Sequence, residues 1–136
     1  MKELTIEAKV ENLHQVLAFV DEYLESLGCP MKIQMQIDVA VEEIFVNVAS
    51  YAYTPSTGSV TLQLESEPSP LSVSITFIDS GVPYNPLAKK DPDVSLSAEE
   101  RSIGGLGIYM VKKSMDEVRY RRENGENILT ILKKLQ

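Results

Sequence analysis

Residues 38–53, with the sequence DVAVEEIFVNVASYAY, decide how the rest of the chain is arranged. Their apolar side chains fall on nearly every side of a helix, and a helix of that kind is normally buried. Glu43 and Asn47 nevertheless lie one turn apart, in the same narrow sector as Gln36 and Ser50. A polar stripe therefore runs along an otherwise apolar helix, and its polar residues need an explanation.

The pair formed by Glu43 and Asn47 offers two kinds of oxygen, about 6 Å apart along the helix axis. Asn47 has a neutral oxygen that suits a hard cation, and the carboxylate of Glu43 can accept a proton or orient a hydroxyl. From this helix alone, a solvated helix edge with a hydrogen-bonded asparagine is the favoured explanation, and the motifs that follow change that balance.

Composition limits the classes of protein to consider. With 136 residues and 43% hydrophobic content, the chain is expected to form one domain over residues 1–136. A net charge of −7 argues against nucleic acid or an anionic membrane as a partner. The single cysteine, Cys29, fits a reducing compartment, and no apolar run resembles a signal peptide or a membrane span. We therefore expect a soluble, cytoplasmic protein.

Periodicity predicts the order β-α-α-β-β-lid-α-β-β. Alternating apolar residues predict strands near 4–10, 60–65, 71–78, 118–122 and 128–135, and helical spacing predicts helices over 13–28, 30–53 and from 104 onward. Asn12 is expected to cap the first helix, and Asn124-Gly125 indicates a hairpin. Residues 84–103 have no clear period and are expected to form a lid over a ligand. The expected fold is a two-layer α+β sandwich, with a mixed, mostly antiparallel sheet and helices on one face.

Two loop motifs carry further chemistry. Asp79 follows a strand of inward-facing apolar residues, so its carboxylate is expected at the floor of a pocket, where it can accept a hydrogen bond from an exocyclic amine such as that of adenine. Gly81 would let a ligand pass close to the backbone. The sequence Asp-Ser-Gly is also typical of an ordinary Asx turn.

The second motif is Gly104-Gly105-Leu106-Gly107, at the start of the third helix. Backbone N–H groups at a glycine-rich helix start suit a phosphate, and Arg101 could add a charged donor. A flexible join and a solvated arginine explain the same residues. The chain has no P-loop motif, and it lacks the H-R-D and D-F-G elements of eukaryotic-type protein kinases.

Taken together, the three motifs resemble those of a known superfamily. Glu43-x-x-x-Asn47, Asp79-x-Gly81-x-Pro83 and Gly105-x-Gly107 are similar to the N, G1 and G2 boxes of the Bergerat-fold ATPases, which include gyrase, histidine kinases and MutL. The resemblance covers nearly the whole chain. Within that group the chain most resembles bacterial anti-sigma factors that are also serine/threonine kinases and phosphorylate a small anti-anti-sigma protein.

The resemblance implies a role for each matching residue. Asn47 would help to hold Mg²⁺ on the ATP phosphates, and Glu43 would act as general base. The other implied nucleotide-binding residues are Tyr51, Asp79, Gly81, Pro83, Arg101, Gly104, Gly105, Leu106 and Gly107. Two positions depart from the pattern: Tyr51-Ala52 stands where relatives often have His-Gly, and Pro83 replaces a second glycine.

The resemblance also implies partners and cofactors. They are ATP and Mg²⁺, an anti-anti-sigma protein of the STAS type, and a sigma factor or similar regulator. A second copy of the chain, packed through the sheet, is a further candidate partner. The alternative function is a non-catalytic switch in which nucleotide binding changes affinity for a partner.

Overall fold

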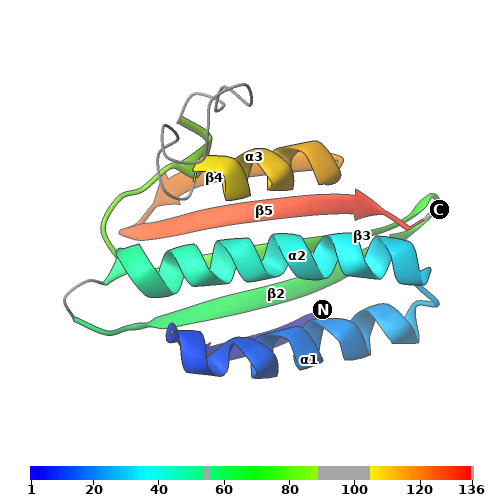
Figure 1. The fold of residues 1–136 in the computed structure, drawn as a ribbon, viewed down its shortest axis with the longest axis horizontal. Coiled ribbons are helices and arrows are strands. Elements are labelled where there is room, and N and C mark those ends of the chain that lie inside the picture. Colours follow the sequence, from blue (N-terminus) through cyan, green and yellow to red (C-terminus); the bar gives the residue numbers. More distant parts are fainter. Residues whose placement is uncertain (54–55, 89–104, 136) are drawn as a thin grey trace.

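A five-stranded antiparallel sheet forms one layer of the protein (Figure 1). The structure is a computed structural model, and it describes residues 1–53, 56–88 and 105–135. The strand order is β1-β2-β3-β5-β4, and all four neighbouring pairs are antiparallel. The bounds are β1 Lys2–Glu7, β2 Ser59–Pro68, β3 Leu71–Asp79, β4 Glu117–Glu123 and β5 Glu126–Lys134. The predicted two-layer α+β fold is confirmed.

Three helices cover one face of this sheet, with α2 in the middle (Figure 1). They are α1 Leu13–Ser26, α2 Met31–Asn47 and α3 Gly105–Ser114, and a π-helical turn, Val48–Ala52, continues α2. Short 3₁₀ turns lie at Val10–Asn12 and Pro86–Ala88. No helix in the described ranges is long and apolar enough to cross a membrane.

The core lies between the helices and the inner face of the sheet. Alternation along β2 and β3 buries Val60, Leu62, Leu64, Ile75 and Phe77, while the intervening residues face the other side. The inner side of α2 packs on them through fully buried Ile37, Ala40, Val41 and Phe45. The central helix is thus fixed against the strand that ends at Asp79.

Turn chemistry agrees with the sequence in one place and differs in another. Asn124 and Gly125 both have positive φ, 51° and 78°, as a two-residue hairpin turn requires, so the predicted β4–β5 hairpin is confirmed. The predicted side-chain cap at Asn12 is wrong, because its Nδ2 donates to the carbonyl of Glu7 instead. Asn12 therefore ties the first helix to the end of β1.

Candidate functional site

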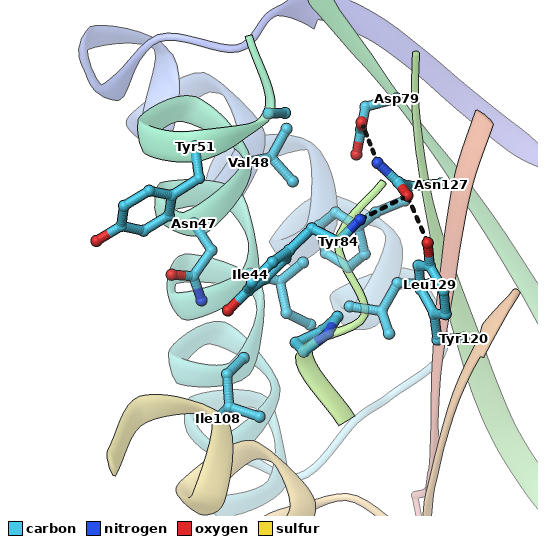
Figure 2. Close-up of a pocket in the computed structure, with 13 residues that line it drawn as sticks. Ile44, Asn47, Val48, Tyr51, Asp79, Tyr84, Ile108, Tyr120, Asn127 and Leu129 are labelled. Atoms are coloured by element: carbon cyan, nitrogen blue, oxygen red, sulfur yellow. Dashed lines mark hydrogen bonds between the residues drawn. The ribbon is translucent and has the colours of Figure 1, made fainter. Parts of the chain in front are cut away.

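One pocket lies between α2 and the neighbouring ends of β3, β4 and β5. Figure 2 shows Asn47 and Tyr51 on its helical side, Asp79, Asn127 and Tyr120 on its sheet side, and Tyr84 between them. The remaining lining residues are mostly apolar: Ile44, Val48, Ala52, Phe77, Pro86, Ile108 and Leu129. An apolar cavity with a few convergent polar groups is the usual form of a small-molecule site.

Asp79 is buried at the end of β3, in the wall of this pocket. Its Oδ1 accepts hydrogen bonds from the Gly81 N–H and from Asn127 Nδ2, both at 2.9 Å. The bond from the Gly81 N–H closes an Asx turn, so Asp79 both forms this turn and lines the pocket. Both of these bonds engage Oδ1 rather than Oδ2.

The packing of the fold requires a glycine at position 81, whether or not a ligand binds there. A Cβ on this residue would collide with the backbone of Ala52, whose carbonyl accepts from the Val82 N–H at 2.9 Å. The loop after β3 therefore packs directly on the π-helical turn that continues α2. Pro83 is exposed and does not line the pocket.

Asn127 is a functional candidate that the sequence did not reveal. Its Nδ2 donates to Asp79 Oδ1 and to the carbonyl of Val82, at 2.9 and 2.8 Å. Its Oδ1 accepts from the Tyr120 hydroxyl at 2.5 Å and from the Tyr84 N–H at 3.3 Å. The buried amide thus fixes both the Asp79 carboxylate and the loop beyond it. The register of β5 against β3 places Asn127 directly opposite Asp79.

Arg122 differs in its contacts from Arg119 and Arg121, the other two arginines of β4. Arg119 and Arg121 form exposed ion pairs within β4, with Glu117 and Glu123. Arg122, however, donates to the carbonyl of Gly81 at 2.8 Å, so it ties the Asp79 loop to β4.

Tyr53 holds the same loop from the helical side. Its hydroxyl accepts from the Ser80 N–H and donates to the carbonyl of Ser59, both at 2.7 Å. Burial raises the pKa of this phenol, so it stays a donor at neutral pH. Its ring also occupies the space that a side chain at Gly58 would need. Tyr53 therefore joins the end of the π-helical turn to the Asp79 corner.

Asn47 and Tyr51 bring the helical layer into the pocket. Asn47 Nδ2 is buried and has no hydrogen-bond partner among the described residues. Tyr51 is 49% exposed, and its ring centroid lies 6.5 Å from that of Tyr84. Both residues belong to the end of α2 and the π-helical turn, and single π-helical turns inside helices are frequent at functional sites.

Glu43 lies beside the pocket rather than in its lining. A Cβ on Gly107 would collide with the Glu43 carboxylate, so Glu43 lies directly against the first turn of α3. Gly105 and Leu106 belong to the same turn, which begins where the glycine motif predicts. Arg101, Gly104 and most of the expected lid, from residue 89 to 103, lie outside the described residues.

The donors present fit a nucleotide and a cation held mainly by its phosphates. Asn47 Nδ2 is buried and lacks a partner among the described residues, and rotation of the carboxamide about its Cβ–Cγ bond would present the amide oxygen at the same place. Mg²⁺ commonly takes few protein ligands and completes its shell with phosphates and water. Accordingly, the described residues contain no cluster of three or more histidine, cysteine, aspartate or glutamate side chains that could hold a metal alone.

A five-stranded sheet under three helices, with Glu43 and Asn47 on the central one, defines the class of Bergerat-fold ATPase domains. The chain belongs to the family of histidine kinase-like ATPase domains, which it matches over residues 6–133.

Two relatives are named as serine- or serine/threonine-protein kinases. The chain is 25% identical over 100 residues to the serine/threonine-protein kinase BtrW of Bordetella bronchiseptica, covering 74% of this chain and 70% of that protein. It is 22% identical over 131 residues to the serine-protein kinase RsbW of Bacillus mycoides, covering 93% and 81%.

Two solved structures share the fold. The RsbU and RsbW domains of a Mycobacterium tuberculosis protein match with a TM-score of 0.64 at 20% identity, over 99% of this chain and 33% of that one. The SiaB–SiaC complex of Pseudomonas aeruginosa matches with a TM-score of 0.57 at 13% identity, over 96% and 88%.

Proposed function

We propose that this protein is an ATP-dependent serine/threonine kinase of the anti-sigma type. Its substrate would be a small anti-anti-sigma protein of the STAS class, and its second partner would be a sigma factor or a similar regulator. The observation that carries the proposal is the unpartnered amide of Asn47, which shares one pocket with the buried carboxylate of Asp79. The relatives named as serine-protein kinases support the reaction class.

In this proposal the Asp79 end of the pocket binds the adenine base, and the Asn47 end binds the phosphates. Asp79 Oδ2 accepts from the exocyclic amine of adenine, while Asn127 and the Gly81 N–H hold Oδ1 and so fix the carboxylate. Asn47 would help to hold Mg²⁺ on the phosphates, and the cation would supply charge neutralisation at the transferred group. The N–H groups at the start of α3, Gly105–Ser114, face the phosphates.

Transfer itself needs a proton acceptor for the incoming hydroxyl. Glu43 accepts the proton of the serine or threonine as the bond from its oxygen to the γ-phosphorus forms and the bond to the ADP oxygen breaks. Most of the rate enhancement would come from positioning and charge stabilisation, because phosphoryl transfer needs little covalent chemistry from the protein. The place of Glu43 against the first turn of α3 supports this role.

A non-catalytic switch is the second candidate, and one observation favours it. Glu43 does not line the pocket that contains Asn47 and Asp79. A protein of this kind would bind ATP or ADP and change its affinity for a partner without transferring phosphate.

Labelled ATP with a candidate STAS antagonist separates the two functions. The kinase predicts transfer of label to one serine or threonine of the antagonist, found by mass spectrometry, and loss of transfer in Glu43→Ala with ATP affinity largely kept. Nucleotide-dependent partner binding without label would support the switch. Absence of both nucleotide binding and transfer would overturn the two proposals together.

A further inference from the structure

The central helix carries a second apolar face that the fold leaves uncovered. Met31, Met35 and Val39 follow one another at four-residue intervals along α2 and are 69%, 61% and 53% exposed. The opposite side of the same helix is fully buried. The core therefore accounts for the apolar residues on the inner side of α2 but not for those on its exposed side.

The uncovered face continues onto the neighbouring helix. Figure 1 shows α3 running antiparallel to α2, and the place of Gly107 against Glu43 sets their register. Met110 lies about one turn after Gly107 on α3. Because the two helices are antiparallel, it is level with residues about one turn before Glu43 on α2, which include Val39. Met110 is 51% exposed. Together Met31, Met35, Val39 and Met110 form what we call the methionine stripe.

A row of this kind differs from scattered apolar residues. Single exposed side chains are normal on protein surfaces, but contiguous apolar residues on adjacent turns mark interaction sites. Methionine is flexible and polarizable, and it is common on surfaces that accept the apolar face of a partner helix. A ridge at i, i+4 and i+8 also matches the side-chain rows by which two helices pack.

Charge indicates the chemistry of the partner. Between Val10 and Asn47, the helical layer carries one lysine, Lys32, and seven acidic residues: Glu11, Asp21, Glu22, Glu25, Asp38, Glu42 and Glu43. Asp21 and Asp38 pair with each other, Glu43 lies against Gly107, and Glu22 lines a hollow with Lys2 and Phe19. Glu25 of α1 and Glu42 of α2 are exposed carboxylates. On the other side of the stripe, α3 presents Lys112 and Lys113 in its last turn. A helix lying on the stripe would thus meet negative charge along the edge that faces α1.

We propose that the methionine stripe is a docking surface for an amphipathic helix of a partner protein, with basic residues flanking its apolar face. The apolar side chains of that helix pack on Met31, Met35, Val39 and Met110. Its basic residues face the carboxylates of α1 and α2. The surface lies on the outside of the helical layer and needs no nucleotide in the pocket, so its test is independent of the kinase proposal.

The probe is a synthetic helix of leucine and lysine, about five turns long, with leucines at helical spacing. It is titrated without nucleotide into protein labelled with ¹³C at the methionine methyl groups. We expect the signals of Met31, Met35 and Met110 to shift, while that of Met115, which is 6% exposed, serves as the internal reference. Equal shifts at Met115, or no shift at the stripe, would overturn the proposal.

Substitutions at constant charge provide the matched control. One variant carries Met31→Gln, Met35→Gln and Val39→Gln together, and it should bind the leucine–lysine peptide about tenfold more weakly or worse. The control is Val10→Gln, at an equally exposed valine before α1, and it should bind as the wild type does. A leucine–glutamate peptide of the same spacing should bind at least about tenfold more weakly. The proposal fails if the triple variant or the acidic peptide binds equally well. It also fails if sedimentation shows a wild-type dimer that the triple variant disperses, since the stripe would then face a second copy.

Discussion

The carboxylate of Glu43 fills the space that a side chain on Gly107 would need. A Cβ at Gly107 would collide with Oε2 and Cδ of Glu43, so the glycine allows the first turn of α3 to lie directly against α2. The obstructing atoms are the far end of a flexible side chain. A larger residue at this position would therefore displace the carboxylate rather than unfold the domain.

Gly107→Ala should separate activity from stability. Alanine favours a helix over glycine by about 1 kcal/mol, so the melting temperature should stay constant or rise. Transfer of phosphate to the partner should fall by about 100-fold, because the proposed base no longer lies where the hydroxyl arrives. Thermal unfolding and a single-turnover transfer assay measure the two effects. A matched double variant with Glu43→Ala should be no slower than Glu43→Ala alone, and a further loss in the double variant would contradict this explanation.

Asp79→Asn tests the oxygen that faces the pocket. The new amide can keep an oxygen toward Gly81 and Asn127, so the loop retains its hydrogen bonds. It presents an NH₂ group where Oδ2 lay, and this donor opposes the exocyclic amine of adenine. Affinity for ATP should fall by about tenfold or more, and preference should move toward GTP, whose base offers a carbonyl at that position. Calorimetric titration with both nucleotides measures this, and unchanged ATP affinity would remove Asp79 from base recognition.

Local patterns in the sequence predict most of the fold. The alternation in β2 and β3, the Asn124-Gly125 turn and the apolar character of α2 depend on neighbouring residues, and each was read correctly. Asn12 occupies the N-cap position of α1 as predicted, but its side chain makes no cap bond, because its Nδ2 donates to the Glu7 carbonyl five residues earlier. Local chemistry offers Asn12 two partners, and only the folded chain decides between them.

The parts of the site that escaped prediction depend on contacts between distant residues. Asn127 reaches Asp79 across 48 positions, Arg122 reaches Gly81 across 41, and Tyr53 reaches Ser80 across 27. None of these residues has a distinctive local pattern. Their roles follow from strand register and from the π-helical turn, which sequence spacing does not reveal.

Arg122→Ala should loosen the loop that carries Asp79. The substitution removes the donor to the Gly81 carbonyl, a charge-assisted bond of the kind that contributes about 1.5–3 kcal/mol. Nucleotide affinity should fall several-fold, and amide exchange at residues 80–82 should become faster. Arg119→Ala is the matched control, because its exposed pair with Glu117 lies in the same strand and should change either quantity little. Equal effects of the two variants would show that Arg122 acts only as surface charge.

Asp21 on α1 and Asp38 on α2 form a pair of carboxyl groups that lack a donor. One oxygen of each, Oδ1, is buried and has no hydrogen-bond partner within the part of the chain that the structure describes. Burial and the neighbouring Asp21 raise the pKa of Asp38 to about 7, with Glu25 adding to the effect. A proton on one carboxyl group supplies the missing donor. The pKa of the Cys29 thiol is also raised. Burial is the larger cause, and the nearby charge of Asp38 is the smaller one.

The sign of the resulting pH dependence follows from the raised pKa. The folded state holds the proton of Asp38 more tightly than the unfolded chain does, whose aspartates titrate near 3.9, so the stabilisation is complete below about pH 4 and is lost as the pH rises to about 7. Asp38→Asn should raise the free energy of unfolding at pH 8 by about 1–2 kcal/mol, a range that allows for solvent screening of a partly exposed group. In this variant the free energy of unfolding should also decrease less between pH 5 and pH 8 than in the wild type. Urea unfolding at both pH values measures this. Glu42→Gln, an exposed carboxylate of the same helix, should leave the slope unchanged, and parallel slopes for the wild type and Asp38→Asn would show that the pair shares no proton.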